Sequence, residues 1–178
     1  GSRIENVSMQ NNEIAFTRIL KHKDDKPAFD FVFNLLDRSI RPLDSLEQFP
    51  SPVHKNGAYV LERSDSKATL YVKKGSQTVA SFRRERNEGY YHFEYTWFRD
   101  LIISGGGFGY IQVYNQSGQT LSNLVGQQGS ITGMAITPDS SFLITSSDDQ
   151  TIRVWDTKLL GKQNVIYPTA SIFIAKNS

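Results

Sequence analysis

The chain contains no cysteine, which excludes disulfide frameworks and thiolate metal sites. Its 178 residues hold no run close to the ~20 apolar residues that a membrane-spanning helix needs. No charged start followed by an apolar stretch indicates a secretory signal, so we expect no membrane partner and a cytoplasmic location. Gly1 and Ser2 look like a remnant of tag removal, and we expect the natural chain to extend beyond them.

The chain also lacks a block of charge of one sign. With 20 basic and 18 acidic residues the formal net charge is only +2, which gives weak support to a nucleic-acid partner. Hydrophobic residues make up 38% of the sequence and charged residues 21%, a composition typical of a globular domain with its own core.

No segment keeps a helical period. Short runs rich in β-branched and aromatic residues alternate instead with turns rich in Gly, Asp, Asn and Ser, which predicts an all-β chain built from hairpins. The predicted strands are Glu13 to Leu20, Phe29 to Leu36, Ala58 to Arg63, Thr69 to Val72, Val79 to Phe82, Tyr90 to Thr96, Leu101 to Ser104, Tyr110 to Tyr114, Ile131 to Thr137, Phe142 to Ser146, Thr151 to Asp156 and Ser171 to Ala175.

A repeat with a period of roughly 40 residues organises these strands. Leu143 to Asp156 and Leu101 to Asn115 share an apolar strand, a small polar turn and a strand that ends in an aromatic residue and Asp or Asn. Tyr59 to Lys73 is a third copy, and Phe16 to Asp37, with a charged turn at 21–26, is a worn fourth. Units of this kind bury their faces against one another as propeller blades.

We therefore predict a partial β-propeller of about three to four four-stranded antiparallel blades. The propeller fragment covers residues 3–178, and whether 3–45 forms a true blade stays open at this point. The predicted blades are 3–45, 46–83, 84–124 and 125–167, with an extra strand at 170–175.

Three segments carry a more specific signal. Gly126 to Ile131, Thr137 to Ser140 and Thr145 to Asp156 together resemble a WD repeat. Such repeats hold their blade with a buried hydrogen-bond relay of His, Ser or Thr, Asp and Trp. The resemblance assigns three of these places to Thr145, Asp149 and Trp155, whereas Gln127 stands where the His belongs. We expect a structural role for all four, because a buried carboxylate needs several donors around it.

The resemblance extends further along the chain. Gly89 to His92, Ser104 to Gly109 and the ending Asn164 to Ala175 are similar to the last blades of bacterial proteins that join WD repeats to a caspase-like peptidase domain. That resemblance covers roughly residues 55–178 and implies the scaffold or sensing part of a larger regulator, with the peptidase elsewhere.

No catalytic, cofactor-binding or metal-binding residue is predicted. His22, His54 and His92 lie in different units without a second ligand at metal spacing. Gly105 to Gly109 precede a strand rather than a helix, so these glycines serve a hairpin turn and not a phosphate. Ser146 to Asp149 lack a base and are typical of a turn.

One surface stands out as a candidate for binding protein partners. Its residues are Arg83, Arg84, Arg86, Tyr90 and Tyr91. We predict a non-catalytic interaction scaffold; the alternatives are nucleic-acid binding through this basic aromatic patch near 83–91, and an enzyme module with a site in the propeller channel. We also predict self-association, because the end blades of an incomplete ring expose apolar faces and strand edges.

Overall fold

The computed structural model describes residues 3–19 and 30–174 and contains four antiparallel four-stranded sheets, one of which gains a fifth, parallel strand. This confirms the all-β propeller prediction, and the described strands within 3–19 and 30–42 form a sheet of their own. The predicted turn at 21–26, the tag remnant and residue 175 lie outside the described residues.

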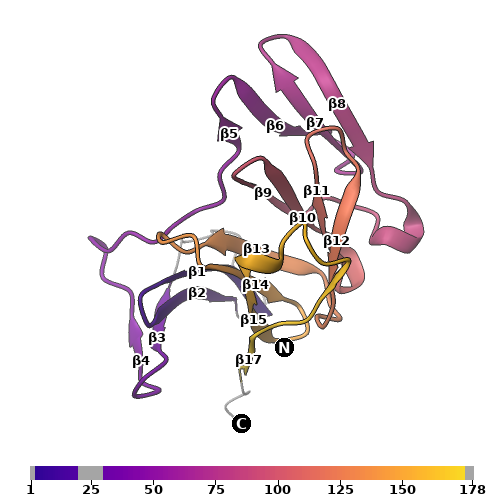
Figure 1. Ribbon diagram of the computed structural model, residues 1–178. Coiled ribbons are helices and arrows are strands. Elements are labelled where there is room, and N and C mark those ends of the chain that lie inside the picture. The colour runs from indigo at the N-terminus through magenta and orange to yellow at the C-terminus, as the bar shows by residue number, and fades with distance from the viewer. Residues whose placement is uncertain (1–2, 20–29, 175–178) are drawn as a thin grey trace.

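The four sheets are named as blades in chain order (Figure 1). Blade 1 contains β1 (Arg3–Gln10), β2 (Glu13–Ile19), β3 (Phe31–Asn34) and β4 (Ile40–Pro42); blade 2 contains β5 (Lys55–Asn56), β6 (Tyr59–Arg63), β7 (Thr69–Lys74) and β8 (Gln77–Arg83). Blade 3 contains β9 (Glu94–Phe98), β10 (Leu101–Gly105), β11 (Ile111–Tyr114), β12 (Thr120–Leu124) and β16 (Val165–Ile166); blade 4 contains β13 (Ile131–Ile136), β14 (Phe142–Ser147), β15 (Thr151–Asp156) and β17 (Ala170–Phe173). Three 3-10 turns are η1 (Arg86–Glu88), η2 (Gly107–Gly109) and η3 (Thr157–Leu159).

Apolar side chains join the blades in an order that differs from the chain order. Trp155 lies in the core between blades 3 and 4, and Leu70 and Trp97 belong to the core between blades 2 and 3. Ile4 and Ile144 share a third core, because β1 packs against β13 and β14. The spatial order is therefore blade 2, blade 3, blade 4, blade 1, as Figure 1 shows.

A linker at 43–54 spans the distance from blade 1 to blade 2 along the inner strands. The Ser8 hydroxyl donates to the carbonyl of Pro50 at 2.6 Å, and the Val53 amide donates to the Thr96 hydroxyl at 2.9 Å. Phe49 packs on Ala15 and Val32, on the face of blade 1 turned away from blade 4. The chain therefore covers that end face itself.

The other end face, on blade 2, is not broadly apolar either. Glu62 and Lys73 alternate there with half-exposed Val60 and Val79, and the two charged side chains form an ion pair at 2.6 Å. The broad apolar end faces behind the prediction of self-association are thus not what the structure has, and self-association stays a prediction.

The strand predicted at 170–175 is β17, but it is not free to complete another sheet. It pairs antiparallel with β15 and forms the outer strand of blade 4. The segment just before it in the chain, β16, pairs in parallel with β12 of blade 3, where the Asn123 amide donates to the Asn164 carbonyl at 2.8 Å. The outer position of blade 4 is therefore occupied by β17 and not by β16.

The strand predicted at Tyr90 to Thr96 begins late. β9 starts at Glu94 because Gly89 and Tyr90 have φ of 86° and 58°, in the left-handed region that ends an extended strand. Tyr90 and Tyr91 therefore lie in a loop and not in a sheet.

Candidate protein-interaction site

Two loops of blade 3 form the candidate site: 84–93, which leads into β9, and 106–110, which joins β10 to β11. The Gly107 amide donates to the Gly89 carbonyl at 2.8 Å. A Cβ on Gly89 would lie 2.5 Å from the Gly107 oxygen, and one on Gly106 would lie 2.6 Å from the Tyr91 oxygen. The glycines thus let the two backbones approach within direct hydrogen-bonding distance.

Arg84 anchors both loops from below. Only 2% of it is exposed, and its guanidinium donates to the carbonyls of Ser104 at 2.5 Å, Glu88 at 2.6 Å and Tyr110 at 3.4 Å. Burial lowers the pKa of this guanidinium from its ordinary value. The prediction that Arg84 belongs to a partner surface is therefore wrong in the free chain, since the loops close over it.

Four aromatic rings lie on top of these loops, and we call them the aromatic surface: Tyr90, Tyr91, Phe93 and Phe108. Their ring centroids follow one another at 5.4 Å from Phe93 to Tyr91, 5.9 Å from Tyr91 to Tyr90 and 6.0 Å from Tyr90 to Phe108. Tyr91 is 40% exposed and Phe108 is 63% exposed. Rings in such contact form one continuous apolar platform.

The backbone below this platform is strained. Tyr90 and Phe108 have φ of 58° and 56°, which bulky residues seldom adopt and which costs of order 1–3 kcal/mol each. The glycine contacts and the Arg84 hydrogen bonds hold this conformation in place. Strain of this kind gathers at binding sites, where the framework enforces a shape that the loop alone would leave.

The remaining predicted surface residues lie beside the platform. Arg83 and Arg86 are exposed, Arg83 approaches Glu85 at 3.7 Å, and Glu85 and Glu88 form a capping box around η1. Arg83 ends β8 and Arg86 begins η1, so both lie on the chain segment that leads into the loop of the two tyrosines. Sequence reasoning missed Phe108 as a surface residue; the signal was a large ring alone among four glycines, which a turn does not need.

The contrast between the buried and the exposed arginine predicts different stabilities. We expect Arg84→Ala to lower the free energy of unfolding by about 2–3 kcal/mol, because three carbonyls lose a charged donor. Arg86→Ala is the control and should stay within about 0.5 kcal/mol of wild type. Urea unfolding followed by tryptophan fluorescence measures both; equal effects would contradict the anchor role of Arg84.

The WD relay of blade 4 is assembled with glutamine in the histidine place. The Trp155 indole donates to the Thr145 hydroxyl at 2.9 Å, and that hydroxyl donates to Oε1 of Gln127 at 2.7 Å. The Gln127 amide donates to Thr151 at 3.4 Å, whose hydroxyl donates to the Asp149 carboxylate at 2.6 Å. All four predicted relay residues belong to one network, with Thr151 as the link to Asp149.

Blade 3 holds the histidine and hydroxyl positions of a second relay, which sequence reasoning did not find. His92 is fully buried, and its Nδ1 lies 2.6 Å from the Ser104 hydroxyl. By register Ser104 corresponds to Thr145, because Ile102 pairs with Tyr114 as Leu143 pairs with Trp155. Burial, and after it the nearby Arg84 charge, lower the pKa of His92 to about 3. The imidazole is therefore neutral inside the fold.

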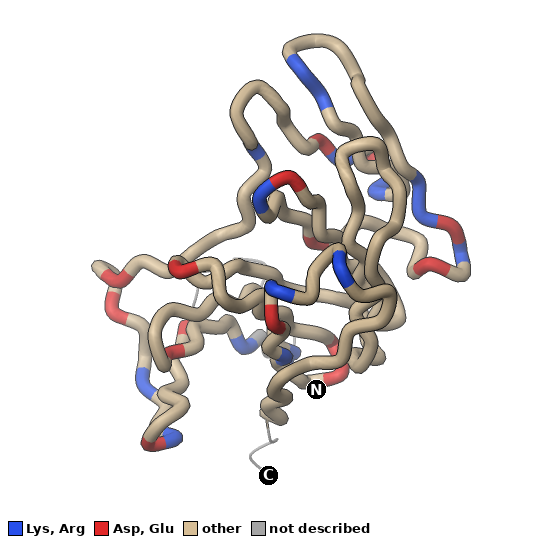
Figure 2. Tube along the Cα trace, viewed as in Figure 1, with Lys and Arg blue, Asp and Glu red and all other residues tan. Residues whose placement is uncertain are grey.

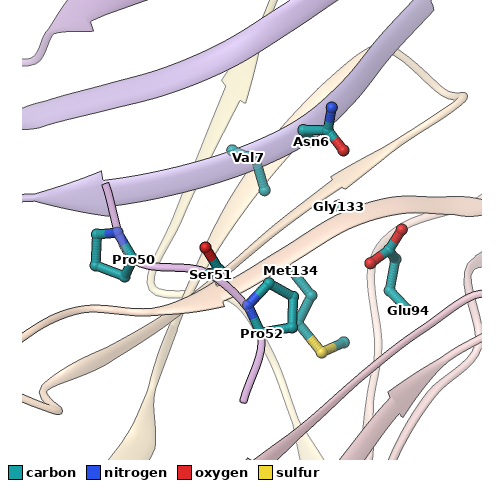
Figure 3. Close-up of a pocket in the computed structure, with 8 residues that line it drawn as sticks. All are labelled: Asn6, Val7, Pro50, Ser51, Pro52, Glu94, Gly133 and Met134. Carbon is teal, nitrogen blue, oxygen red and sulfur yellow. The ribbon is translucent and has the colours of Figure 1, made fainter. Parts of the chain in front are cut away.

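A pocket of about 210 Å³ lies on the channel side, between the linker and the inner strands (Figure 3). Its lining comes from β1, β9, β13 and the linker: Asn6, Val7, Pro50, Ser51, Pro52, Glu94, Gly133 and Met134. Glu94 is the one titratable side chain in that lining.

No cluster of three or more His, Cys, Asp or Glu side chains within 3–19 and 30–174 has the arrangement to hold a metal ion. In the same part of the chain no helix has the length and apolar character to cross a membrane.

The segment that contains the blade 4 relay matches a known family of repeats. Residues 118–156 match the family described as WD domain, G-beta repeat, and this segment spans β12 to β15 with Gln127, Thr145, Asp149 and Trp155. The chain contains a WD40 repeat. Two curated relatives are the nuclear distribution protein PAC1 of Gibberella zeae, 32% identical over 63 residues, and that of Scheffersomyces stipitis, 43% identical over 42 residues.

Those alignments cover 35% and 24% of this chain, and only 14% and 8% of the relatives' own length. Solved structures resemble the whole fold. A chain of the mitotic checkpoint complex superposes with a TM-score of 0.57 at 13% identity, over 97% of this chain and 50% of that one. The C-terminal WD40 domain of Sif2 gives a TM-score of 0.55 at 15% identity, over 99% and 48%. At these identities the likeness shows the WD40 propeller fold alone.

Proposed function

We propose that this chain is a non-catalytic protein-interaction scaffold that binds a protein partner through the aromatic surface. The observation that carries the proposal is the exposure of Phe108 and Tyr91 on loops that are strained, joined by glycines and anchored by Arg84. Exposed aromatic rings beside arginines are the residue types that dominate protein interfaces. A rigid platform also loses little conformational entropy when a partner binds.

The comparisons support a scaffold more than they support a particular pathway. The checkpoint structure is a protein complex, so a propeller of this fold does serve as a component of an assembly. Both named curated relatives are fungal nuclear distribution proteins, and neither name mentions a peptidase. A place in a bacterial regulator that carries a caspase-like peptidase therefore stays a prediction.

The loop composition favours a protein over a nucleic acid. Arg84 is buried beneath the loops and offers no phosphate contact, and Glu85 and Glu88 flank Arg86. Two of the three arginines in the basic aromatic patch, Arg83 and Arg86, are on the surface, and the two carboxylates Glu85 and Glu88 lie next to them. Such a mixed field gives little of the electrostatic attraction on which nucleic-acid binding depends.

A photo-crosslinking experiment tests the proposal. The photoreactive amino acid p-benzoylphenylalanine is placed at Tyr91 of the protein in cells that produce it, and crosslinked species are identified by mass spectrometry. We expect a protein adduct, and we expect Phe108→Ala to weaken its formation by about thirtyfold, the equivalent of a 2 kcal/mol interface anchor. The control places the same probe at Tyr167, which is 70% exposed and lies outside the aromatic surface.

The adducts distinguish a protein partner, a second copy of the chain and nucleic acid. An adduct from Tyr91 that Phe108→Ala weakens as expected supports the scaffold, and an adduct with a second copy of the chain would identify that copy as the partner. Crosslinking to nucleic acid, or equal protein adducts from Tyr91 and Tyr167, would overturn the proposal.

A further inference from the structure

The outer edge of blade 2 is an unprotected strand. β8 (Gln77–Arg83) is seven residues long, pairs only with β7 and has one neighbour in its sheet. It contains no proline, and its single charge is at its end, Arg83. Edge strands are normally guarded against added strands by proline, by charge within the strand, by short length or by a cover.

The other three outer edges among the described residues have such protection. β4 has three residues and ends in Pro42, and β17 has four residues. The edge of β12 is filled by β16, with Asn123 paired to Val165 and Leu124 paired to Ile166. The molecule itself thus shows that the outer edge of a blade accepts one more strand.

The surroundings of β8 define the chemistry of what fits there. Residues 55–83 contain six basic and two acidic side chains, and Figure 2 shows the basic positions spread over blade 2. On the outward face, Lys73 pairs with Glu62 and Arg83 stays exposed. Val79, 44% exposed, supplies an apolar contact on the same face.

From these observations we infer that β8 is a docking edge for an extended acidic segment of a protein partner, which adds to blade 2 as a fifth strand. Backbone hydrogen bonds hold such a strand, and alternate side chains select it. Acidic residues of the partner face Arg83 and, across β8, the longer Lys73 side chain, and its alternate aliphatic residues turn to the opposite face beside Ala80 and Phe82. Arg83, at the end of β8, is the one residue that this edge shares with the predicted partner surface; the four rings of the aromatic surface are not part of the edge, so the inference does not rest on the proposed function.

A second copy of the chain is the less favourable occupant of this edge. Two β8 strands pairing with each other would bring together two blades that each carry an excess of basic side chains. Like charges across a new sheet oppose that pairing, whereas an acidic segment relieves them.

The test uses a defined probe, the peptide acetyl-Glu-Val-Glu-Val-Thr-Val-Glu-Val-Glu-amide. We expect binding with a dissociation constant on the order of 0.1 mM and slower amide hydrogen exchange within residues 77–83. Val79→Glu should weaken binding at least about tenfold by repelling the acidic peptide. Thr120→Glu is the matched control, because it adds the same charge to the outer strand of blade 3, away from β8, and should bind as wild type does.

Two further probes keep the inference open to refutation. The same peptide with Pro at its centre lacks a backbone donor and should not bind, and a version with Lys in place of Glu should not bind either. Equal binding of the Pro peptide, or binding without protection of 77–83, would overturn strand addition. Protection of 77–83 without peptide but at high protein concentration would show that a second copy occupies the edge, and protection by a single-stranded oligonucleotide alone would show nucleic acid; either result overturns the inference.

Discussion

Gly109→Ala should be among the most destabilising single substitutions in this chain, with a loss of more than about 4 kcal/mol in the free energy of unfolding. A Cβ at this position would lie 1.7 Å from the carbonyl oxygen of Gln127 and 2.3 Å from its carbonyl carbon. Neither atom can move alone, because Gln127 is part of the buried relay to Thr145 and Trp155. The backbone φ of 79° adds strain for any residue with a side chain.

The control for this prediction is Gly75→Ala. Gly75 also has a positive φ, 59°, but a Cβ there meets nothing within 4 Å. It should therefore lose only the conformational part, about 1–2 kcal/mol. Urea denaturation of both variants separates the cost of the steric clash from the cost of the backbone conformation. If both substitutions lower the free energy of unfolding equally, Gly109 is not required for the close contact with Gln127.

The blade 4 relay could be predicted from the sequence because its residues lie close together in one repeat. The turn between β14 and β15 keeps Thr145, Asp149 and Trp155 within eleven positions, and strand periodicity then points Thr145 and Trp155 to one side. The same local logic gave the all-β fold and the need for glycine at 105–109, where Gly109 does have a positive φ.

The features that could not be predicted depend on contacts between loops that are separate in the sequence. Arg84 looks like its neighbours Arg83 and Arg86 in the sequence, yet the carbonyls of Ser104 and Tyr110, from another hairpin, bury it. Phe108 becomes exposed only because Gly89 and Gly106 bring two loops together. Charge and hydropathy alone cannot rank such residues, since burial here is decided by backbone contacts between loops.

The position of blade 1 has the same cause. The repeat in blade 1 is too degenerate to show which face of its sheet packs against another blade. In the structure β1 packs on β13 and β14, which come much later in the chain. Linker residues then have to return past the inner strands, and Phe49 closes the remaining face. The prediction of self-association assumed that both end faces of the open ring are exposed. The repeat pattern does not show that the linker covers one of them.

Acid should destabilise the fold through His92, the second relay histidine. Its pKa is about 3 in the folded chain and 6.5 ordinarily, so between these values the unfolded chain binds a proton that the folded chain does not. Stability from this group is therefore complete above about pH 6.5 and falls by about 1.4 kcal/mol per pH unit below it, or about 4 kcal/mol by about pH 3.5. Urea unfolding at a series of pH values measures the slope.

Two substitutions isolate this effect, because the chain already contains both versions of the relay. In His92→Gln the amide can bond to Ser104 as Gln127 bonds to Thr145, so the fold should persist and the slope from His92 should disappear. Carboxylates such as Glu47, whose Arg41 hydrogen bonds lower its pKa to about 2, lose stability in acid in both proteins and cancel in the difference. Gln127→His should do the reverse and add acid sensitivity to blade 4. If His92→Gln kept the wild-type slope, the acid response would belong to other groups and the buried imidazole would not be the neutral relay member that its hydrogen bond to Ser104 indicates.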